Sequence, residues 1–211
     1  MTITRFIVVR HGETHWNVEA RIQGQGDSDL TATGVAQAEA IAERLTAERF
    51  DLLVSSDLGR ALATARRIAE RCGHPIATDK RLRERHFGAG EGLTYDEIGR
   101  EYPGAFSRTH ETDPEFAIPG GESRRTFHER VVAAFESIAR EHSGRRIAVV
   151  THGGVLGTLY RHVHGIPIAM PHKVPITNAT YNALAVRDGL WTIESWDDGA
   201  HLSATEPFEE D

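Results

Sequence analysis

Cysteine is nearly absent from this chain of 211 residues. Cys72 is the only one, so a disulfide within the chain is excluded and a reducing compartment, the cytoplasm, is expected. No apolar run approaches the roughly 20 residues that span a bilayer, and the N-terminus lacks the basic start and longer apolar stretch of a signal peptide. We therefore expect no membrane partner.

Positive charge is also in short supply. Lysine and arginine total 24 against 31 acidic residues, which gives a net charge of −7 and a sequence pI near 5.9. This balance disfavours nucleic acid as a partner, because nucleic-acid-binding domains carry basic surfaces. An anionic substrate would therefore need a local cluster of positive charge. Hydrophobic residues make up 39% and charged residues 26%, which is typical of a globular domain rather than a disordered chain.

Strands and helices are expected to alternate along the chain. Apolar runs predict strands over 3–9, 51–54, 75–78, 147–150, 181–186 and 190–196. Apolar stripes predict helices over 31–48, from a cap at 55–57 to 72, over 95–101, over 122–141 and from the second His-Gly to about 164. This order predicts an α/β fold, a three-layer α/β/α sandwich with a mostly parallel central sheet. No linker or repeat interrupts it, so we expect a single domain over 1–211, with an irregular lid at about 86–121 and an acidic tail after about 200.

Two of the predicted strands end in a histidine followed by a glycine. The residues at these two tips are Arg10, His11, Gly12, His152 and Gly153. A third strand leads to Arg60 in the first turn of its helix. Ligands of open α/β sheets bind beyond the carboxyl ends of the strands, so these side chains converge if the strands are neighbours. Each glycine lets the backbone come close to a ligand, and such a cluster suits a tetrahedral dianion such as phosphate.

These motifs have a family resemblance. The segment "RHGET" at 10–14, with Asn17, resembles the signature of the histidine phosphatase (phosphoglycerate mutase-like) superfamily. The segments "LTATG", "SSDLGRALATA", "LRERHFGAGEG" and "THGG" follow in matching order and spacing. They resemble the family's first helix and the segments that supply its second pocket arginine, its acid and its second histidine, here Arg60, Glu84 and His152. The resemblance covers nearly the whole chain to about residue 164, and segments in order are specific where a lone Arg-His-Gly is not.

The resemblance implies a phosphohistidine mechanism. Neutral His11 attacks phosphorus through one ring nitrogen, while the other nitrogen carries a proton and donates it to a backbone carbonyl. Glu84 protonates the leaving alkoxide and then takes a proton from the water that opens the phosphohistidine. The implied phosphatase needs neither a metal nor a cofactor.

The same resemblance implies how the phosphoryl group is held. Arg10, Arg60 and a protonated His152 bind the non-bridging oxygens, where charge accumulates in the transition state. Asn17 donates a further hydrogen bond. The other residues that we expect to bind substrate are Thr14, Gln23, Gly24 and Gly153, the middle two through backbone groups on the loop after the first strand.

Some residues allow a second interpretation. Glu91 offers a carboxylate near Glu84, but the family pattern favours Glu84 as the acid and leaves Glu91 structural. The sequence "HGETH" superficially suggests a zinc pair of His11 and His15, but Gly12 after a strand argues against a helix there. We therefore expect no metal and place His15 at the pocket rim.

The segment Gly120–Ser123 is left open between a turn with a helix cap and a wall of the pocket.

The choice between phosphatase and mutase depends on the segment after the acid. In cofactor-dependent phosphoglycerate mutases, which the family includes, this insertion is longer and carries a lysine and an arginine pair. Here 93–118 has Arg100 and Arg108 but no lysine and no adjacent arginine pair. The sequence therefore favours a phosphomonoesterase acting on a small phosphorylated metabolite. The alternative is a mutase that interconverts 2- and 3-phosphoglycerate with 2,3-bisphosphoglycerate as primer. The natural substrate is not readable, and a homodimer is left open.

Overall fold

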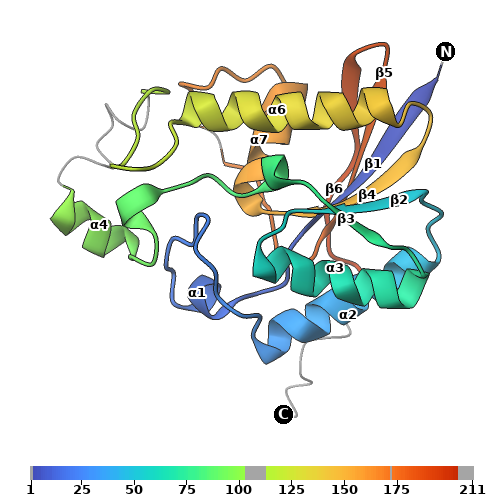
Figure 1. Ribbon diagram of the computed structural model, residues 1–211, viewed down its shortest axis with the longest axis horizontal. Helices are drawn as coiled ribbons and strands as arrows, with labels where there is room; N and C mark the ends of the chain where they lie inside the picture. The colour runs from blue at the N-terminus through green and yellow to red at the C-terminus, as the bar shows by residue number, and fades with distance from the viewer. Residues whose placement is uncertain (1, 103–112, 172, 204–211) are drawn as a thin grey trace.

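A single twisted sheet organises the computed structural model, which describes residues 2–102, 113–171 and 173–203 (Figure 1). The strands are β1 (Ile3–Arg10), β2 (Leu52–Ser55), β3 (Ile76–Thr78), β4 (Arg146–Thr151), β5 (Tyr181–Arg187) and β6 (Leu190–Asp198). They lie in the order β3-β2-β4-β1-β5-β6. The first four of these are mutually parallel, and β5 is antiparallel to both β1 and β6. The predicted α/β fold with a mostly parallel sheet is confirmed.

Two helices cover each face of the sheet (Figure 1). Helices α6 (Arg124–Glu141) and α7 (Gly153–Val163) lie on one face, and α2 (Ala32–Thr46) and α3 (Gly59–Cys72) lie on the other. Two short helices, α1 (His15–Val18) and α4 (Tyr95–Glu101), lie to one side (Figure 1). The chain also forms two 3₁₀ turns, η1 (Lys80–Leu82), which contacts α6, and η2 (Gly88–Gly90). Within the described residues, no helix is both long and apolar enough to cross a membrane.

The central strand β1 divides its side chains between two cores. Phe6 and Val8 pack with α6 and α7, while Ile7 and Val9 pack with α2 and α3, because successive side chains of a strand point to opposite faces. All four are buried, and full burial of such a side chain stabilises by about 1.5–3 kcal/mol. Packing on both faces therefore holds the tip of β1 in place.

The start of α3 corrects one prediction. The expected cap from 55–57 is wrong, because Leu58 takes the N-cap position and makes no side-chain cap bond. The carboxylate of Asp27, from the loop after β1, instead accepts the N–H groups of Gly59 and Arg60. A cap supplied from so far along the chain leaves no signal in the local sequence.

The predicted lid and tail are only partly described. Helix α4 lies in the lid, and its Ile98 forms a small apolar cluster with Ile22 and Ile118. Residues 103–112 of the lid and 204–211 of the tail lie outside the described residues.

The segment Gly120–Ser123 forms a turn and a helix cap. Gly120 has a φ of +79°, and the Ser123 hydroxyl accepts the N–H of Thr126 at 3.1 Å at the start of α6. None of these four residues lines the main cavity described below. The structure therefore favours the cap over the pocket wall.

We expect Ser123→Ala to lower the free energy of unfolding by about 1 kcal/mol, because it removes the α6 cap. Denaturant unfolding measures this effect, and kcat/KM should stay unchanged. Ser137→Ala is the matched control, since Ser137 lies in the interior of α6 and its hydroxyl donates to Glu141 on the same helix. A loss of activity with intact stability would instead place Ser123 in the pocket wall.

Candidate active site

The pairing of β1 with β4 brings the two histidines together. In this parallel pair Arg10 lies opposite Thr151, so the next residues, His11 and His152, follow at neighbouring tips. Their ring centroids are 5.3 Å apart. Because β2 pairs with the other side of β4, the helix that follows it carries Arg60 to the same edge.

The imidazole of His11 is held in one tautomer. Its Nδ1 lies 2.8 Å from the carbonyl oxygen of Gly12, and its Nε2 accepts a hydrogen bond from Nε of Arg60 at 3.2 Å. An acceptor at Nε2 requires the proton to sit on Nδ1. Burial, followed by the charges of Arg60 and Arg10, holds the pKa of His11 well below its ordinary value. The ring is therefore neutral and keeps a lone pair on Nε2.

Gly12 is required for a reason that the sequence does not show. A Cβ at this position would lie 2.3 Å from the carbonyl oxygen of Gly34 in α2. The missing side chain makes room for a helix rather than for a ligand. Gly153 fits the expected close approach better, since it lines the cavity beside the Arg10 guanidinium.

Arg60 is 2% exposed and is held by a ring of acceptors. Its terminal nitrogens donate to the carbonyl oxygens of Gly24 and Gly26, both at 2.7 Å, and to the Asp27 carboxylate at 3.2 Å. Gly24 has a φ of +55°, and its missing side chain leaves room for the Glu91 carboxylate. Gly24 lines the cavity, but its carbonyl group orients Arg60, so a contact of Gly24 with substrate stays a prediction.

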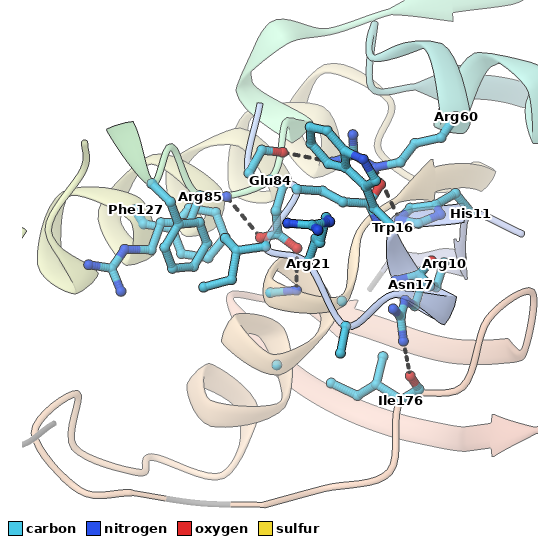
Figure 2. Close-up of a pocket in the computed structure, with 18 of the residues that line it drawn as sticks. Arg10, His11, Trp16, Asn17, Arg21, Arg60, Glu84, Arg85, Phe127 and Ile176 are labelled. Carbon is cyan, nitrogen blue, oxygen red and sulfur yellow. Dashed lines mark hydrogen bonds between the residues drawn. The ribbon is translucent and has the colours of Figure 1, made fainter. Parts of the chain in front are cut away.

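Arg10 and Asn17 reach the cavity from opposite ends of the signature segment. Arg10 donates from Nη1 to the carbonyl oxygen of Ile176 at 2.6 Å (Figure 2), while its buried Nε has no hydrogen-bond partner among the described residues. The Asn17 side chain also lines the cavity.

Thr14 does not line the cavity, because its buried hydroxyl caps α1 and bonds Asn17. Gln23 lines the cavity as predicted, and its buried Oε1 has no partner within residues 2–102, 113–171 and 173–203.

His152 lies behind the cavity lining rather than on it. The ring is fully buried, its Nε2 lies 2.8 Å from the Ser56 hydroxyl, and its Nδ1 has no partner in the part of the chain that the structure describes. Burial and then the charge of Arg60 hold the pKa of His152 well below its ordinary value. Burial and the nearby arginines disfavour the imidazolium ion. A protonated His152 therefore stays a prediction, which depends on the negative charge of a bound phosphoryl group.

The two candidate acids have different surroundings. Among the described lining residues, Glu84 is the only one with a carboxylate, and it accepts the N–H groups of Arg85 and Gly154, both at 2.8 Å (Figure 2). The Glu91 carboxylate instead accepts three backbone N–H groups, from Gln25, Gly26 and Phe87. Glu91 thus ties the loop after β1 in place and is structural, as predicted.

The cavity has a volume of about 590 Å³ and a positive lining. Five arginines of the described residues line it against the single glutamate: Arg10, Arg21, Arg60, Arg85 and Arg124. This is the local cation cluster that an anionic substrate needs in a chain of net charge −7. His15 is exposed and does not line it.

Several lining residues were not predicted: Trp16, Arg21, Arg85, Phe87, Tyr95, Arg124, Phe127 and Ile176. Arg85 and Phe127 lie on the side of the cavity away from His11 and Arg60 (Figure 2). Arg85 directly follows Glu84, and this position next to the predicted acid could have indicated that Arg85 lines the cavity. In the sequence, Phe127 is part of the apolar stripe of a helix, which predicts a core position. The structure shows that it contacts both the core and the cavity.

A search of the described residues finds no group of three or more His, Cys, Asp or Glu side chains that could hold a metal ion.

The two buried histidines should make stability depend on pH. Their pKa values are lowered on folding, so below their ordinary value of 6.5 the unfolded chain binds more protons than the folded one. The free energy of unfolding should therefore fall with falling pH, by up to about 1.4 kcal/mol per pH unit for each histidine.

Denaturant unfolding between about pH 7 and about pH 5, in phosphate-free buffer, tests this. His11→Gln and His152→Gln should each flatten the fall, whereas the exposed His15→Gln should leave it unchanged. Equal slopes in all three variants would contradict the tautomer and burial described above.

The comparisons with known proteins agree with this geometry. A family model of the histidine phosphatase superfamily (branch 1) matches residues 6–199. The chain is 43% identical over 205 residues to a metal-independent phosphoserine phosphatase of Arabidopsis thaliana, covering 96% of this chain and 84% of that protein. It is also 43% identical over 204 residues to phosphoglycerate mutase-like protein 4 of the same plant, covering 94% and 87%.

Among solved structures, YhfR of Bacillus stearothermophilus matches with a TM-score of 0.88 at 35% identity, covering 94% of this chain and 99% of that one. Sequence, sheet order and site thus lead to one assignment. The chain belongs to branch 1 of the histidine phosphatase superfamily, with the phosphoglycerate mutase-like fold, and is an enzyme of the histidine phosphatase type.

Proposed function

We propose that the protein is a phosphomonoesterase that hydrolyses small phosphorylated metabolites through a phosphohistidine on His11. The observation that carries this proposal is the state of His11, whose Nδ1 proton is held by the Gly12 carbonyl group while Nε2 keeps its lone pair beside Arg60 and Arg10. A neutral imidazole aimed from a rigid strand tip at a cationic cavity is an activated nucleophile for phosphorus.

In the first step, Nε2 of His11 attacks phosphorus and the ester oxygen leaves. Arg10 and Arg60 stabilise the charge that develops on the non-bridging oxygens, and the amide of Asn17 adds a hydrogen bond. Neutral His152 supports the same group by donating its Nδ1–H, provided that its Nε2 accepts the hydroxyl proton of Ser56. A bound phosphoryl dianion would in turn raise the pKa of His152.

Glu84 transfers the proton in both steps. In its protonated form it gives a proton to the departing alkoxide, and as a carboxylate it takes one from the water that attacks the phosphohistidine. That second step breaks the N–P bond and returns His11 to its neutral state with free phosphate as product. The position of Glu84 as the sole carboxylate among the described lining residues supports this role.

The far wall supports a substrate that carries a second anionic group. Arg85 lines it, and its guanidinium bonds the carbonyl groups of Glu122 and Phe116 but forms no ion pair among the described residues. The relative named for phosphoserine acts on an ester that also bears a carboxylate. A carboxylate at this wall would face His11 across the cavity.

The alternative function is a phosphoglycerate mutase, which the name of the second relative keeps open. Incubation with 3-phosphoglycerate, with and without 2,3-bisphosphoglycerate, separates the two functions. We expect free phosphate to accumulate. Accumulation of 2-phosphoglycerate in its place would favour the mutase.

His11→Ala should abolish turnover of a panel of metabolite phosphates and remove the labelled phosphoenzyme that wild type forms with a radiolabelled ester. The nucleophile is lost while the fold remains. His15→Ala is the matched control, since His15 is an exposed histidine four positions away, and it should retain activity. Turnover that survives His11→Ala would sink the proposal.

Glu84→Gln should lower kcat by about 10²–10⁴ for alkyl phosphates, because the leaving alkoxide then receives no proton. The loss should be far smaller for p-nitrophenyl phosphate during phosphoenzyme formation, since p-nitrophenolate leaves without protonation. Rapid-quench kinetics with both esters measures the difference. Glu91→Gln is the control, and any effect of it should be independent of the leaving group.

A further inference from the structure

The loop before β5, residues 176–180, touches the nucleophile segment at several points. Besides accepting the Arg10 guanidinium through Ile176 (Figure 2), it carries Asn178, whose side-chain Nδ2 donates to the main-chain carbonyl oxygen of His11 at 2.9 Å. This loop therefore contacts a phosphate-binding arginine and the nucleophile's own backbone without supplying a reacting group.

Asn178 also acts on the orientation of Asn17. The Oδ1 atom of Asn17 receives the backbone N–H of Thr14 and the Thr14 hydroxyl, both at 3.1 Å, and the Nδ2 of Asn178 at 3.4 Å. With its oxygen surrounded by donors, the Asn17 amide presents its Nδ2 in the other direction. Because Asn17 lines the cavity, a donor rather than an acceptor is available to a phosphoryl oxygen.

The loop is itself anchored by one carboxylate. Asp197 at the end of β6 accepts the N–H of Thr177 at 2.7 Å and the hydroxyls of Thr177 and Thr180 at 3.1 and 3.0 Å. Ala179 and Asp197 both have left-handed φ values, of +55° and +49°, which residues with side chains rarely adopt. Such conformations persist where the surrounding contacts over-determine them, so this loop is built to hold a shape.

We propose that Asn178 is a positioning residue for phosphoryl transfer, which fixes the Asn17 amide and the His11 backbone, and that Asp197 anchors it. The inference rests on the proposed phosphoryl chemistry of His11 but assigns residues that the reaction itself does not consume. Neither Asn178 nor Asp197 lines the cavity.

The anchor also contributes charge. Arg10 is buried, and burial lowers its pKa, while the negative charges of Glu84 and, more weakly, of Asp197 act in the opposite direction. The side chains of Asp197 and Arg10 form no direct ion pair among the described contacts. The anchor therefore acts on the site chiefly through the geometry of the loop.

The first variant is Asn178→Asp, which keeps the shape but replaces the donor by an acceptor and adds a negative charge. The neutral Asn178→Ala, used in the double-mutant cycle below, separates the effect of the lost donor from that of the charge. An oxygen of the new carboxylate would then face two acceptors, the His11 carbonyl oxygen and Asn17 Oδ1. To avoid this repulsion, the Asn17 amide should rotate and turn its oxygen toward the cavity, where it would repel phosphate. We expect the Kd of inorganic phosphate, measured by calorimetry on the full chain, to rise about tenfold or more. kcat/KM for p-nitrophenyl phosphate should fall by a similar factor.

A matched control separates positioning from general stability. Asp198→Asn changes the neighbouring carboxylate, which pairs with Arg44 and does not touch the 176–180 loop. It should lower the melting temperature while phosphate binding stays as in wild type. Asp197→Asn should instead weaken phosphate binding, because it replaces the carboxylate that accepts three hydrogen bonds of the loop. The loss of a negative charge alone would strengthen the binding of an anion, so weaker binding reports on the geometry of the loop.

A double-mutant cycle then tests the route of the effect. Asn178→Ala should raise the phosphate Kd about tenfold in wild type but less than about twofold in an Asn17→Ala background. Additive effects in an active enzyme would overturn this inference and leave the proposed function intact. Coupled effects on phosphate binding in an enzyme without turnover would support the inference and overturn the proposed function. A wild type that binds no phosphate would overturn both.

Discussion

The burial of the Arg60 guanidinium is the constraint on which the rest of the site depends. A cation that is 2% exposed is stable only if its donors find acceptors, and here they reach Gly24, Gly26, Asp27 and His11. Three of these acceptors belong to the loop after β1, and the fourth is the nucleophile. One buried side chain therefore sets the position of the loop and the tautomer of His11 together.

The same constraint explains why neighbouring features take the form they do. The loop must turn its carbonyl groups toward Arg60, so its N–H groups point away from that side chain. The Glu91 carboxylate accepts hydrogen bonds from two of these N–H groups. Asp27 serves both as a partner of Arg60 and as the cap of α3, so the helix that carries the arginine is stabilised by the loop that the arginine organises. A positive cavity in a chain of net charge −7 is thus maintained by local carbonyl groups and a few carboxylates, not by the overall charge.

The fold and the centre of the site could be predicted because their signals are local. Apolar periodicity predicts the strands, and the parallel topology predicts that they end at the same edge of the sheet. The two histidines, one at each of two strand tips, are therefore expected at that edge. What the sequence does not show are contacts between distant segments. The cap from Asp27, the fit of Gly12 against α2 and the exposure of Arg85 to the cavity all require the packed structure. The lowered pKa of His152 is likewise absent from the sequence pattern, since the surroundings that lower it are assembled only by the fold.

The contacts of the 176–180 loop bear on when the active site can form during synthesis of the chain. Its bonds to Arg10 and His11 join residues 166 and 167 positions apart, among the longest separations in the chain. A domain generally folds as a unit, and contacts between residues far apart in the sequence form slowly. The histidines and arginines are therefore translated well before the segment that aligns them, and β6 with its anchoring carboxylate comes later still. A growing chain accordingly carries its phosphate-reactive residues in an unaligned state until the last hairpin docks, so catalytic competence is acquired at the end of folding.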